Sequence, residues 1–208
     1  MKKSLGLPQN YEYKLWQRGM ESIAGVDEVG RGAVAGPIVA AAVIFHPEAN
    51  LTGINDSKQL SARARQDRFV AIIRNARAWG IGIVDHAIID GQGIQSANRL
   101  AFRQALDRLP VRPDHIVFDA LGIPFKNISS ESMIKADAKV FTVAAASIVA
   151  KVFRDWLMAR YALDLPGYHF ERHKGYGTEQ HRAAIHQLGL SPIHRKSFCK
   201  NFTNRSAQ

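Results

Sequence analysis

The amino-acid sequence predicts an α/β fold in which helices flank a mixed β-sheet. Short apolar runs that end in acids or glycines alternate with segments whose apolar residues recur every three to four positions. This alternation is typical of a sheet covered by helices. The 208 residues are 46% hydrophobic, and that length and composition suit a globular chain with one good core.

Four strands are expected. The apolar run 23–27 ends in acids, and a glycine-rich loop separates it from the buried run IVAAAVIF at 38–45. The run GIGIVDHAII at 80–89 predicts a third strand. HIVFD at 115–119, bounded by a proline and a glycine, predicts a fourth that again ends in an acid.

Helices are expected between and after these strands. Ser61 is a good N-cap for the first, and the second covers 96–109 before a proline. Asp137 is expected to open a long alanine-rich helix that runs to about residue 162. HFERHKGYGT at 169–178 predicts a loop, and 179–189 a further helix before a basic tail.

The charge of the chain predicts an anionic partner. Lys and Arg number 28 against 18 Asp and Glu, so the formal net charge is +10. A compact chain with this surplus attracts polyanions, and we expect nucleic acid, with an anionic membrane surface as the alternative.

The expected location is the cytoplasm. Cys199 is the only cysteine, so no intramolecular disulfide can form. The N-terminal residues lack the apolar segment of a signal peptide. The longest apolar stretch, 33–45, is interrupted by Gly36 and Pro37 and is too short to span a bilayer.

Four carboxylates stand where strands end or a helix begins, namely Asp27, Glu28, Asp119 and Asp137. Strand ends at one edge of an open α/β sheet are where ligands bind. Carboxylates that converge there need cations, and Mg²⁺ or Mn²⁺ prefers oxygen ligands. Adjacent strand residues point to opposite faces, so Asp27 and Glu28 can share a site only if their strand ends there. The alternative is a set of solvated strand-end acids, with Asp137 as a helix N-cap.

The segment Gly30-Arg31-Gly32 follows the first pair of acids. With the residues after it, the segment matches the dinucleotide-binding pattern G-x-G-x-x-G/A. That pattern requires a helix to begin in the loop, whereas a strand follows here, so a nucleotide cofactor is not expected.

Other polar residues are weaker candidates. Ser147 and Lys151 share one face of the long helix and can meet a phosphate. Lys58 lies in a polar loop, and Tyr176 stands between glycines beside a lysine, an arrangement that suits contact with a sugar or base. Each can instead be an ordinary surface or core residue. His169 and His173 are expected at the surface rather than in a zinc site.

The sequence resembles the ribonuclease HII family. The segments GVDEVGRGAVAGP, DSK, VFDALG, KADAKVFTVAAASIVAKVFRD, HKGYGT and GLSPIHRKSF occur in the order found in that family, between about Ile23 and Phe198. The short segment before Ile23 favours this type over the related ribonuclease HIII, which has an extra N-terminal domain.

The resemblance implies a ribonuclease H-like fold with a mixed five-stranded sheet and a C-terminal helical appendage. It divides the chain into a lead-in segment (1–22), a catalytic domain (23–163) and a helical, basic extension of the same domain (164–208). It implies a monomer that cuts the RNA strand of RNA/DNA hybrids and nicks DNA 5′ of an embedded ribonucleotide, in DNA replication and repair.

The resemblance also assigns residues. Asp27, Glu28, Asp119 and Asp137 are implied as catalytic metal ligands for Mg²⁺ or Mn²⁺, with two ions expected during hydrolysis. Gly30, Arg31 and Gly32 are implied to read the ribose 2′-hydroxyl, and Tyr176 to stack near the junction sugar. Lys58, Ser147 and Lys151 are expected to contact phosphates.

Three residues depart from the family pattern. Ala33 stands where proline is common, and Ala120 and Ala136 stand where glycine is usual. They bear on loop geometry around the acids rather than on the chemistry.

Two other functions are compatible with parts of the sequence. A nucleic-acid-binding module without catalysis would need no acid cluster. Another metal-dependent nuclease of the same fold, such as a Holliday-junction resolvase, would cut junctions that lack ribose.

Overall fold

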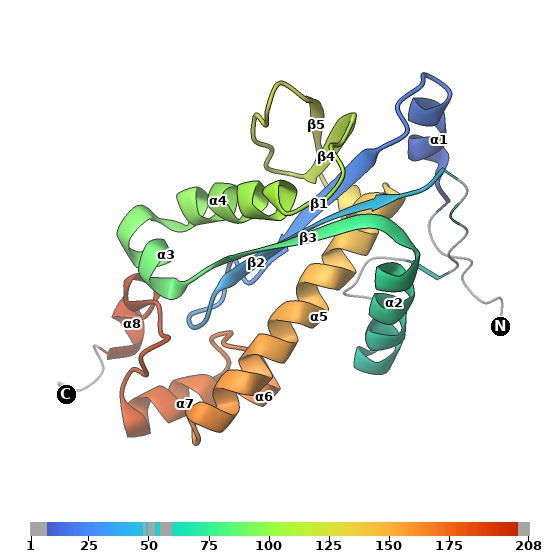
Figure 1. Cartoon of the computed structure of the whole chain (residues 1–208). Helices are drawn as coiled ribbons and strands as arrows, with labels where there is room; N and C mark the ends of the chain where they lie inside the picture. Colours follow the sequence, from blue (N-terminus) through green and yellow to red (C-terminus); the bar gives the residue numbers. More distant parts are fainter. Residues whose placement is uncertain (1–7, 48, 50–52, 55–59, 204–208) are drawn as a thin grey trace.

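The protein is a mixed five-stranded sheet between helices (Figure 1). The computed structural model describes residues 8–47, 49, 53–54 and 60–203. The strands are β1 (Ile23–Val29), β2 (Ile38–Phe45), β3 (Ala76–Val84), β4 (His115–Asp119) and β5 (Ser129–Met133). The helices are α1 (Asn10–Trp16), α2 (Ala62–Asn75), α3 (His86–Gln92), α4 (Ile94–Asp107), α5 (Phe141–Asp164), α6 (Phe170–His173), α7 (Glu179–Leu188) and α8 (Lys200–Thr203), with 3₁₀ turns η2 (Ala136–Ala138) and η3 (Lys196–Phe198).

The strand order is β3-β2-β1-β4-β5. β1, β2 and β3 form an antiparallel meander, whereas β4 is parallel to β1 and β5 is parallel to β4. The predicted mixed five-stranded sheet is therefore confirmed. The parallel pair matters for function because it brings the C-terminal ends of β1 and β4 together.

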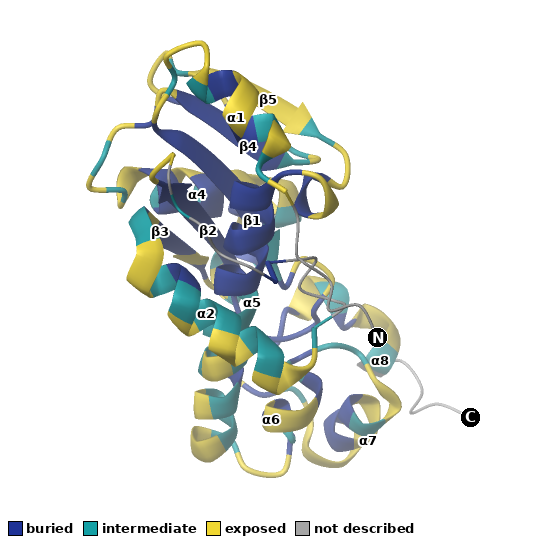
Figure 2. Ribbon diagram, turned by 90° about the vertical axis from the view of Figure 1, so that its right-hand side faces the viewer, coloured by how far each residue is buried: buried dark blue, intermediate teal, exposed yellow. Residues whose placement is uncertain are grey.

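Two helices cover opposite faces of the sheet, α4 on one and α5 on the other (Figure 1). Every residue of β2 is buried, and its central residues are three alanines. Gly25 of β1 shows how closely α5 approaches, because a Cβ at this position would lie 2.2 Å from the carbonyl carbon of Thr142. The first half of α5 is buried and its second half is more exposed (Figure 2).

The N-terminal segment is more than a polar lead-in. Leu15 of α1 is buried against the sheet, and Glu12 is fully buried. The Glu12 carboxylate accepts hydrogen bonds from the Thr142 N–H and hydroxyl at 2.8 and 3.0 Å. Glu12 thus satisfies donors in the first turn of α5, whose own N-cap residue, Val140, cannot do so with its side chain.

The secondary structure predicted from sequence needs four corrections. β3 ends at Val84, because the Asp85 carboxylate accepts from the Ile88 N–H and starts α3 where a strand was expected. β1 continues through Val29 instead of ending at the acids. Asp137 lies in the η2 turn, and the long helix begins at Phe141. The predicted loop 169–178 contains the short helix α6.

The C-terminal helices pack on the outer half of α5. Met158 of α5 and Ala35 form a buried cluster with Tyr168, Phe170 and Ala184 of α7. The predicted helical appendage is thus present, while the three-part division of the chain stays a prediction. No helix in the described residues is long and apolar enough to cross a membrane. The cytoplasmic location and the monomeric state remain expectations.

Ala120 follows β4 in a left-handed conformation, with φ of 56°. A Cβ is unfavourable there, and glycine is the residue that adopts this conformation readily. Ala120→Gly should therefore raise the free energy of unfolding by about 0.5–1 kcal/mol and the melting temperature by about 1–4 °C. Thermal unfolding of Ala136→Gly is the matched control. Ala136 is buried in a 3₁₀ turn, so its loss of a methyl group should destabilise the protein. A lowered melting temperature for Ala120→Gly would contradict the assigned strain.

Candidate active site

Three carboxylates meet at the C-terminal ends of two parallel strands. The register pairs Val26 of β1 with Phe118 of β4, so the next residues, Asp27 and Asp119, are neighbours. Asp137 reaches them from the η2 turn. One oxygen from each of the three side chains lies within 4.8 Å of the others. The sequence prediction that these acids converge is therefore correct for this triad.

Glu28 belongs to the same site but approaches it from the other face of the sheet. Val26 packs with Phe102 of α4, while Gly25 lies against α5, so the alternation of the strand directs Asp27 towards α5 and Glu28 towards α4. The strand does not end at the acids, since β1 continues through Val29, and Glu28 is not in the group of three carboxylates whose oxygens converge. β1 extends past the end of β4, and Glu28 lines the open cavity together with Asp27 from the uncovered strand edge.

The cavity combines acids, cations and an aromatic ring. Asp27 and Glu28 of β1, Asp119 of β4, and Ser147 and Lys151 of α5 face one space. Its lining residues are Asp27, Glu28, Val29, Arg65, Asp119, Ser147, Lys151 and Tyr176. The structure thus brings together six of the residues predicted from sequence and adds Arg65.

The acids are electrostatically unfavourable without cations. Burial raises the pKa of Asp27 well above its usual value, and the charges of Glu28 and Asp119 raise it further, while a hydrogen bond from Ser147 opposes them. Burial also raises the pKa of Glu28 to about 6, against the lowering effect of Arg31. The Asp27 and Asp119 side chains each accept one main-chain N–H, from Glu28 at 2.7 Å and from Ala136 at 2.8 Å. These bonds orient the two carboxylates at the ends of their strands.

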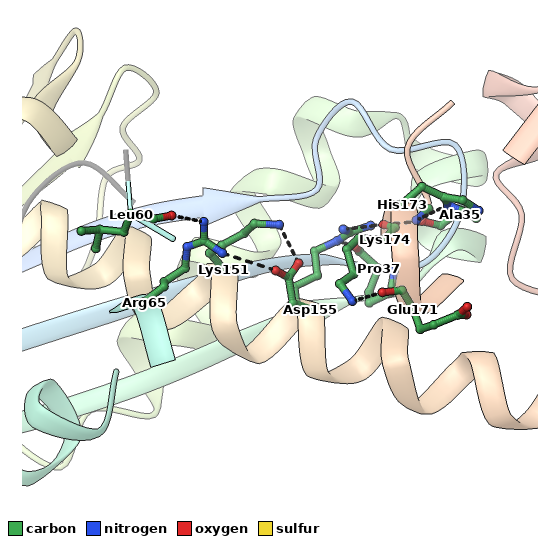
Figure 3. A network of polar contacts seen from close by, with 11 residues as sticks. Ala35, Pro37, Leu60, Arg65, Lys151, Asp155, Glu171, His173 and Lys174 are labelled. Atoms are coloured by element: carbon green, nitrogen blue, oxygen red, sulfur yellow. Dashed lines mark hydrogen bonds and ion pairs between the residues drawn. The ribbon is translucent and has the colours of Figure 1, made fainter. Parts of the chain in front are cut away.

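A second charged group lies beside the acids on α5 and α2 (Figure 3). Lys151 Nζ is 2.6 Å from Asp155 Oδ1, and Arg65 Nη1 is 3.8 Å from the other oxygen of the same carboxylate. Arg65 also donates to the Leu60 carbonyl at 2.9 Å. Asp155 therefore holds two cations at the cavity. Sequence reasoning missed Arg65 because nothing distinguishes it from the other arginines of α2.

The loop of Gly30, Arg31 and Gly32 after β1 packs on the buried side chain of Arg154. Gly30 has φ of 90°, and a Cβ there would lie 2.2 Å from Arg154 Nε. At Gly32 a Cβ would meet nothing within 4 Å, and Arg31 is exposed. The two glycines thus serve different purposes: Gly30 makes room for a buried side chain, while Gly32 leaves the outer face of the loop open.

The loop that carries Tyr176 is joined to the glycine loop. The Val34 and Ala35 N–H groups donate to the Gly175 carbonyl at 2.8 and 3.2 Å. Arg154 bridges both segments, since its guanidinium donates to the carbonyls of Ala35 and Lys174. The same guanidinium lies 5.4 Å from the centre of the Tyr176 ring. Tyr176 is half-buried rather than exposed, with its ring at the cavity.

A second buried arginine supports the same loop. Arg195 is fully buried and donates to the carbonyls of Gly36 and Arg31 at 3.0 and 3.1 Å. Sequence reasoning missed both arginines. Arg154 had a signal, because its spacing from Ser147 and Lys151 places it on the same face of α5. Arg195 had none, since its contacts form only in the folded chain.

Two other predicted residues need comment. Lys58 lies outside the described residues. His173 is buried, which corrects the expectation of a surface histidine, whereas His169 is partly exposed. His173 is held by main-chain groups of its own loop, as a carbonyl and an N–H both contact its ring nitrogens.

Comparison with known proteins places the chain in a family. The family model for ribonuclease HII matches residues 24–201. The ribonuclease HII of Listeria monocytogenes serotype 4b is 49% identical over 191 residues, which cover 91% of this chain and 72% of that protein. The ribonuclease HII of Ligilactobacillus salivarius is 49% identical over 187 residues, covering 90% and 73%.

Solved structures agree on the fold. The ribonuclease H2 of Pyrococcus horikoshii has a TM-score of 0.73 at 26% identity and covers 87% of this chain and 96% of its own. A Bst ribonuclease HIII solved in complex with Mn²⁺ has a TM-score of 0.63 at 22% identity, covering 86% and 67%. With the acidic triad at the strand ends, these matches show that this chain belongs to the ribonuclease HII family and has the function of a ribonuclease HII.

Proposed function

We propose that the protein hydrolyses the RNA strand of RNA/DNA hybrids and nicks duplex DNA 5′ of embedded ribonucleotides. The products would carry 3′-hydroxyl and 5′-phosphate ends, and the role would be removal of misincorporated ribonucleotides. The observation that carries this proposal is the convergence of Asp27, Asp119 and Asp137 at the end of β1, which leads directly into the loop of Gly30, Arg31 and Gly32. Arg31 Nη1 of this loop lies 3.9 Å from Glu28 Oε1. The acids supply a cation site, and the loop supplies an open main chain next to it.

The acidic site fits Mg²⁺ or Mn²⁺, and we expect two ions during catalysis. Three carboxylates with closely spaced oxygens are a ligand set for hard divalent cations, and Glu28 adds a fourth carboxylate at the cavity. Bound ions would supply an activated water and stabilise the leaving 3′-oxygen. The solved ribonuclease HIII that contains Mn²⁺ supports this choice of metal.

The other cavity residues bind and orient the nucleic acid. Gly32 lets the sugar approach the main chain, and Arg31, which is exposed and lies 3.9 Å from Glu28, offers its guanidinium beside it. Lys151 and Arg65, held by Asp155, present positive charge to the phosphates, and Ser147 orients Asp27. Tyr176 offers its ring to the sugar at the ribose–deoxyribose junction. Lys58 is proposed as a further phosphate contact on the resemblance alone.

The test is an assay with duplex DNA that contains one ribonucleotide, with the product ends mapped. The proposal expects a Mg²⁺-dependent nick on the 5′ side of the ribonucleotide and no cut in an all-DNA four-way junction. Binding without cleavage would favour a binding module, and cleavage of the junction would favour a resolvase.

Metal binding should stabilise the folded protein in a pH-dependent way. Glu28 has its pKa raised to about 6 and Asp27 is raised as well, so protonation of these acids stabilises the metal-free fold at low pH, and this stabilisation is lost as pH rises through about 6. Mg²⁺ competes with those protons. The gain in melting temperature on adding millimolar Mg²⁺ should therefore be larger at about pH 8 than at about pH 5.

Asp27→Asn is the matched variant for this measurement. It should shrink the Mg²⁺-induced gain in melting temperature and abolish cleavage, because a ligand charge is lost while the shape is kept. Full nicking activity in Asp27→Asn would remove Asp27 from the site.

Lys151 should act on all duplexes alike. Binding is expected to weaken steeply as salt rises, since each phosphate contact releases counterions. Lys151→Ala should weaken binding to DNA, hybrid and mixed duplexes by similar factors and reduce the slope of log K against log salt by about 1. Lys14→Ala on α1, an exposed cation that does not line the cavity, is the control. A loss confined to one sugar or one base sequence would contradict the phosphate assignment.

Tyr176 should matter most where the substrate has a single junction. Tyr176→Ala removes a ring contact worth on the order of 1–3 kcal/mol, so nicking at one embedded ribonucleotide should slow by about tenfold or more. Cleavage of a continuous hybrid should suffer less, because no single junction sets its register, and Tyr176→Phe should retain most activity. Equal losses on both substrates together with a lowered melting temperature would identify Tyr176 as a structural anchor.

A further inference from the structure

Three buried histidines form a cluster that contacts the main chain of Tyr176 and of the residue before it. His181 is on α7, His173 closes α6 and His194 follows in the C-terminal segment. Their exposed fractions are 0%, 9% and 1%. The rings of His173 and His181 stack with centroids 4.1 Å apart, and those of His181 and His194 are 5.1 Å apart.

Hydrogen bonds from the main chain determine which nitrogens of this group carry a proton. The Ser191 N–H donates to His194 Nδ1 at 2.8 Å, so a neutral His194 has its hydrogen on Nε2. His194 Nε2 lies 3.0 Å from His181 Nε2 and donates to it. His181 therefore carries its hydrogen on Nδ1, which lies 2.9 Å from the Tyr176 carbonyl and donates to it. The result is a one-directional chain from Ser191 to Tyr176.

His173 holds the preceding residue in the same way. Its Nδ1 accepts the Gly175 N–H at 3.2 Å, so its Nε2 carries the hydrogen and donates to the Tyr168 carbonyl at 2.7 Å. The imidazoles thus bind the main chain immediately before Tyr176 and at its own carbonyl. That carbonyl also accepts the Thr178 N–H at 2.8 Å, which makes a tight turn at the ring-bearing residue.

The three rings are neutral in this arrangement. Burial lowers the pKa of His181 and of His194 to about 4, and it lowers the pKa of His173 as well. All six ring nitrogens have a partner among the contacts described, so this group is a relay of hydrogen bonds rather than a set of metal ligands. Within the described residues, the group contacts the cavity lining through the main chain of Tyr176.

We propose that His181, oriented by His194, is a positioning residue that holds the Tyr176 ring at the edge of the acidic cavity and so sharpens recognition of the ribose–deoxyribose junction. This inference rests on the proposed role of Tyr176. His181 touches no substrate and acts only through the main chain of Tyr176. Replacing His181 should therefore reduce the cleavage rate in the same way as removing the Tyr176 ring, but to a smaller extent. It should have no further effect on the rate once the ring is absent.

Two substitutions separate positioning from packing. His181→Leu removes both ring nitrogens and fills much of the space. His181→Asn keeps a donor, because an asparagine amide nitrogen can occupy the place of Nδ1 and donate to the Tyr176 carbonyl. His186→Leu is the matched control, since His186 is exposed on the same helix.

The experiment measures kcat/KM on duplex DNA with one ribonucleotide and on a continuous RNA/DNA hybrid, for each variant alone and combined with Tyr176→Ala. His181→Leu should lower kcat/KM by about fivefold to tenfold on the duplex with one ribonucleotide and by less than about twofold on the hybrid. His181→Asn should retain most of the kcat/KM of the parent protein. In the Tyr176→Ala background, His181→Leu should change the rate by less than about twofold. His186→Leu should behave as the parent.

Other outcomes overturn the inference. The inference is wrong if the reductions in kcat/KM caused by His181→Leu and Tyr176→Ala multiply in the double variant. It is also wrong if His181→Leu lowers kcat/KM equally on both substrates. Either result means that His181 acts on the fold in general. If Tyr176→Ala alone leaves kcat/KM unchanged on both substrates, the proposed role of Tyr176 is wrong, and this inference fails with it. Should His181→Leu fail to fold, His194→Asn replaces it, because this side chain can still accept the Ser191 N–H but no longer reaches His181. Its loss of about twofold to threefold should likewise vanish in the Tyr176→Ala background.

Discussion

The parallel pairing of β1 with β4 is the constraint on which the site depends. It sets Asp27 beside Asp119 at one end of the sheet, and the alternation of β1 then directs Glu28 to the opposite face. A register shift of one residue in either strand would turn the acid of that strand away from α5 and separate it from its neighbour. The packing around this pair is correspondingly rigid: β2 is wholly buried beside β1, and α5 approaches so closely that Gly25 cannot carry a side chain. The position of the acids is therefore a consequence of core packing rather than of local loop structure.

This placement destabilises the metal-free protein locally. Burial and like charge raise the pKa of Asp27 and Glu28, so the fold holds acids that favour protonation unless a cation is near. Asp155 differs from these acids because it forms ion pairs with the Lys151 and Arg65 side chains, which line the same cavity. The cavity thus has an acidic side and a basic side, an arrangement that suits the cleavage of a polyanion by a metal-dependent enzyme.

Much of the fold and of the acidic triad could be predicted from the sequence, because apolar runs that end in Asp27 and Asp119 are local signals. β5 was found only through the resemblance, since its segment SSESM is polar and largely exposed and carries no apolar alternation. The face taken by Glu28 depends on how far β1 extends beyond β4, which is a tertiary property. Arg195 could not be placed because its main-chain partners, Gly36 and Arg31, are distant in the sequence. The histidines contact main-chain groups of nearby residues, but the contact between His181 and His194 depends on how two segments fold together, which a residue-type pattern does not encode.

The buried arginines that support the loops of Gly30 and Tyr176 have neutral partners throughout the contacts described. Arg154 and Arg195 are fully buried, and their hydrogen bonds go to main-chain carbonyls. Burial removes the Arg195 guanidinium from contact with water and, together with the nearby charge of Arg154, lowers its pKa to about 9. A carboxylate partner would stabilise each guanidinium better, but it would add another acid near the metal site and neutralise the charge beneath the loops. Carbonyls and neutral imidazoles fix the loops without either effect. The positive charge of the two arginines is therefore not neutralised by these partners, and the partners add no acid beside Asp27, Asp119 and Asp137.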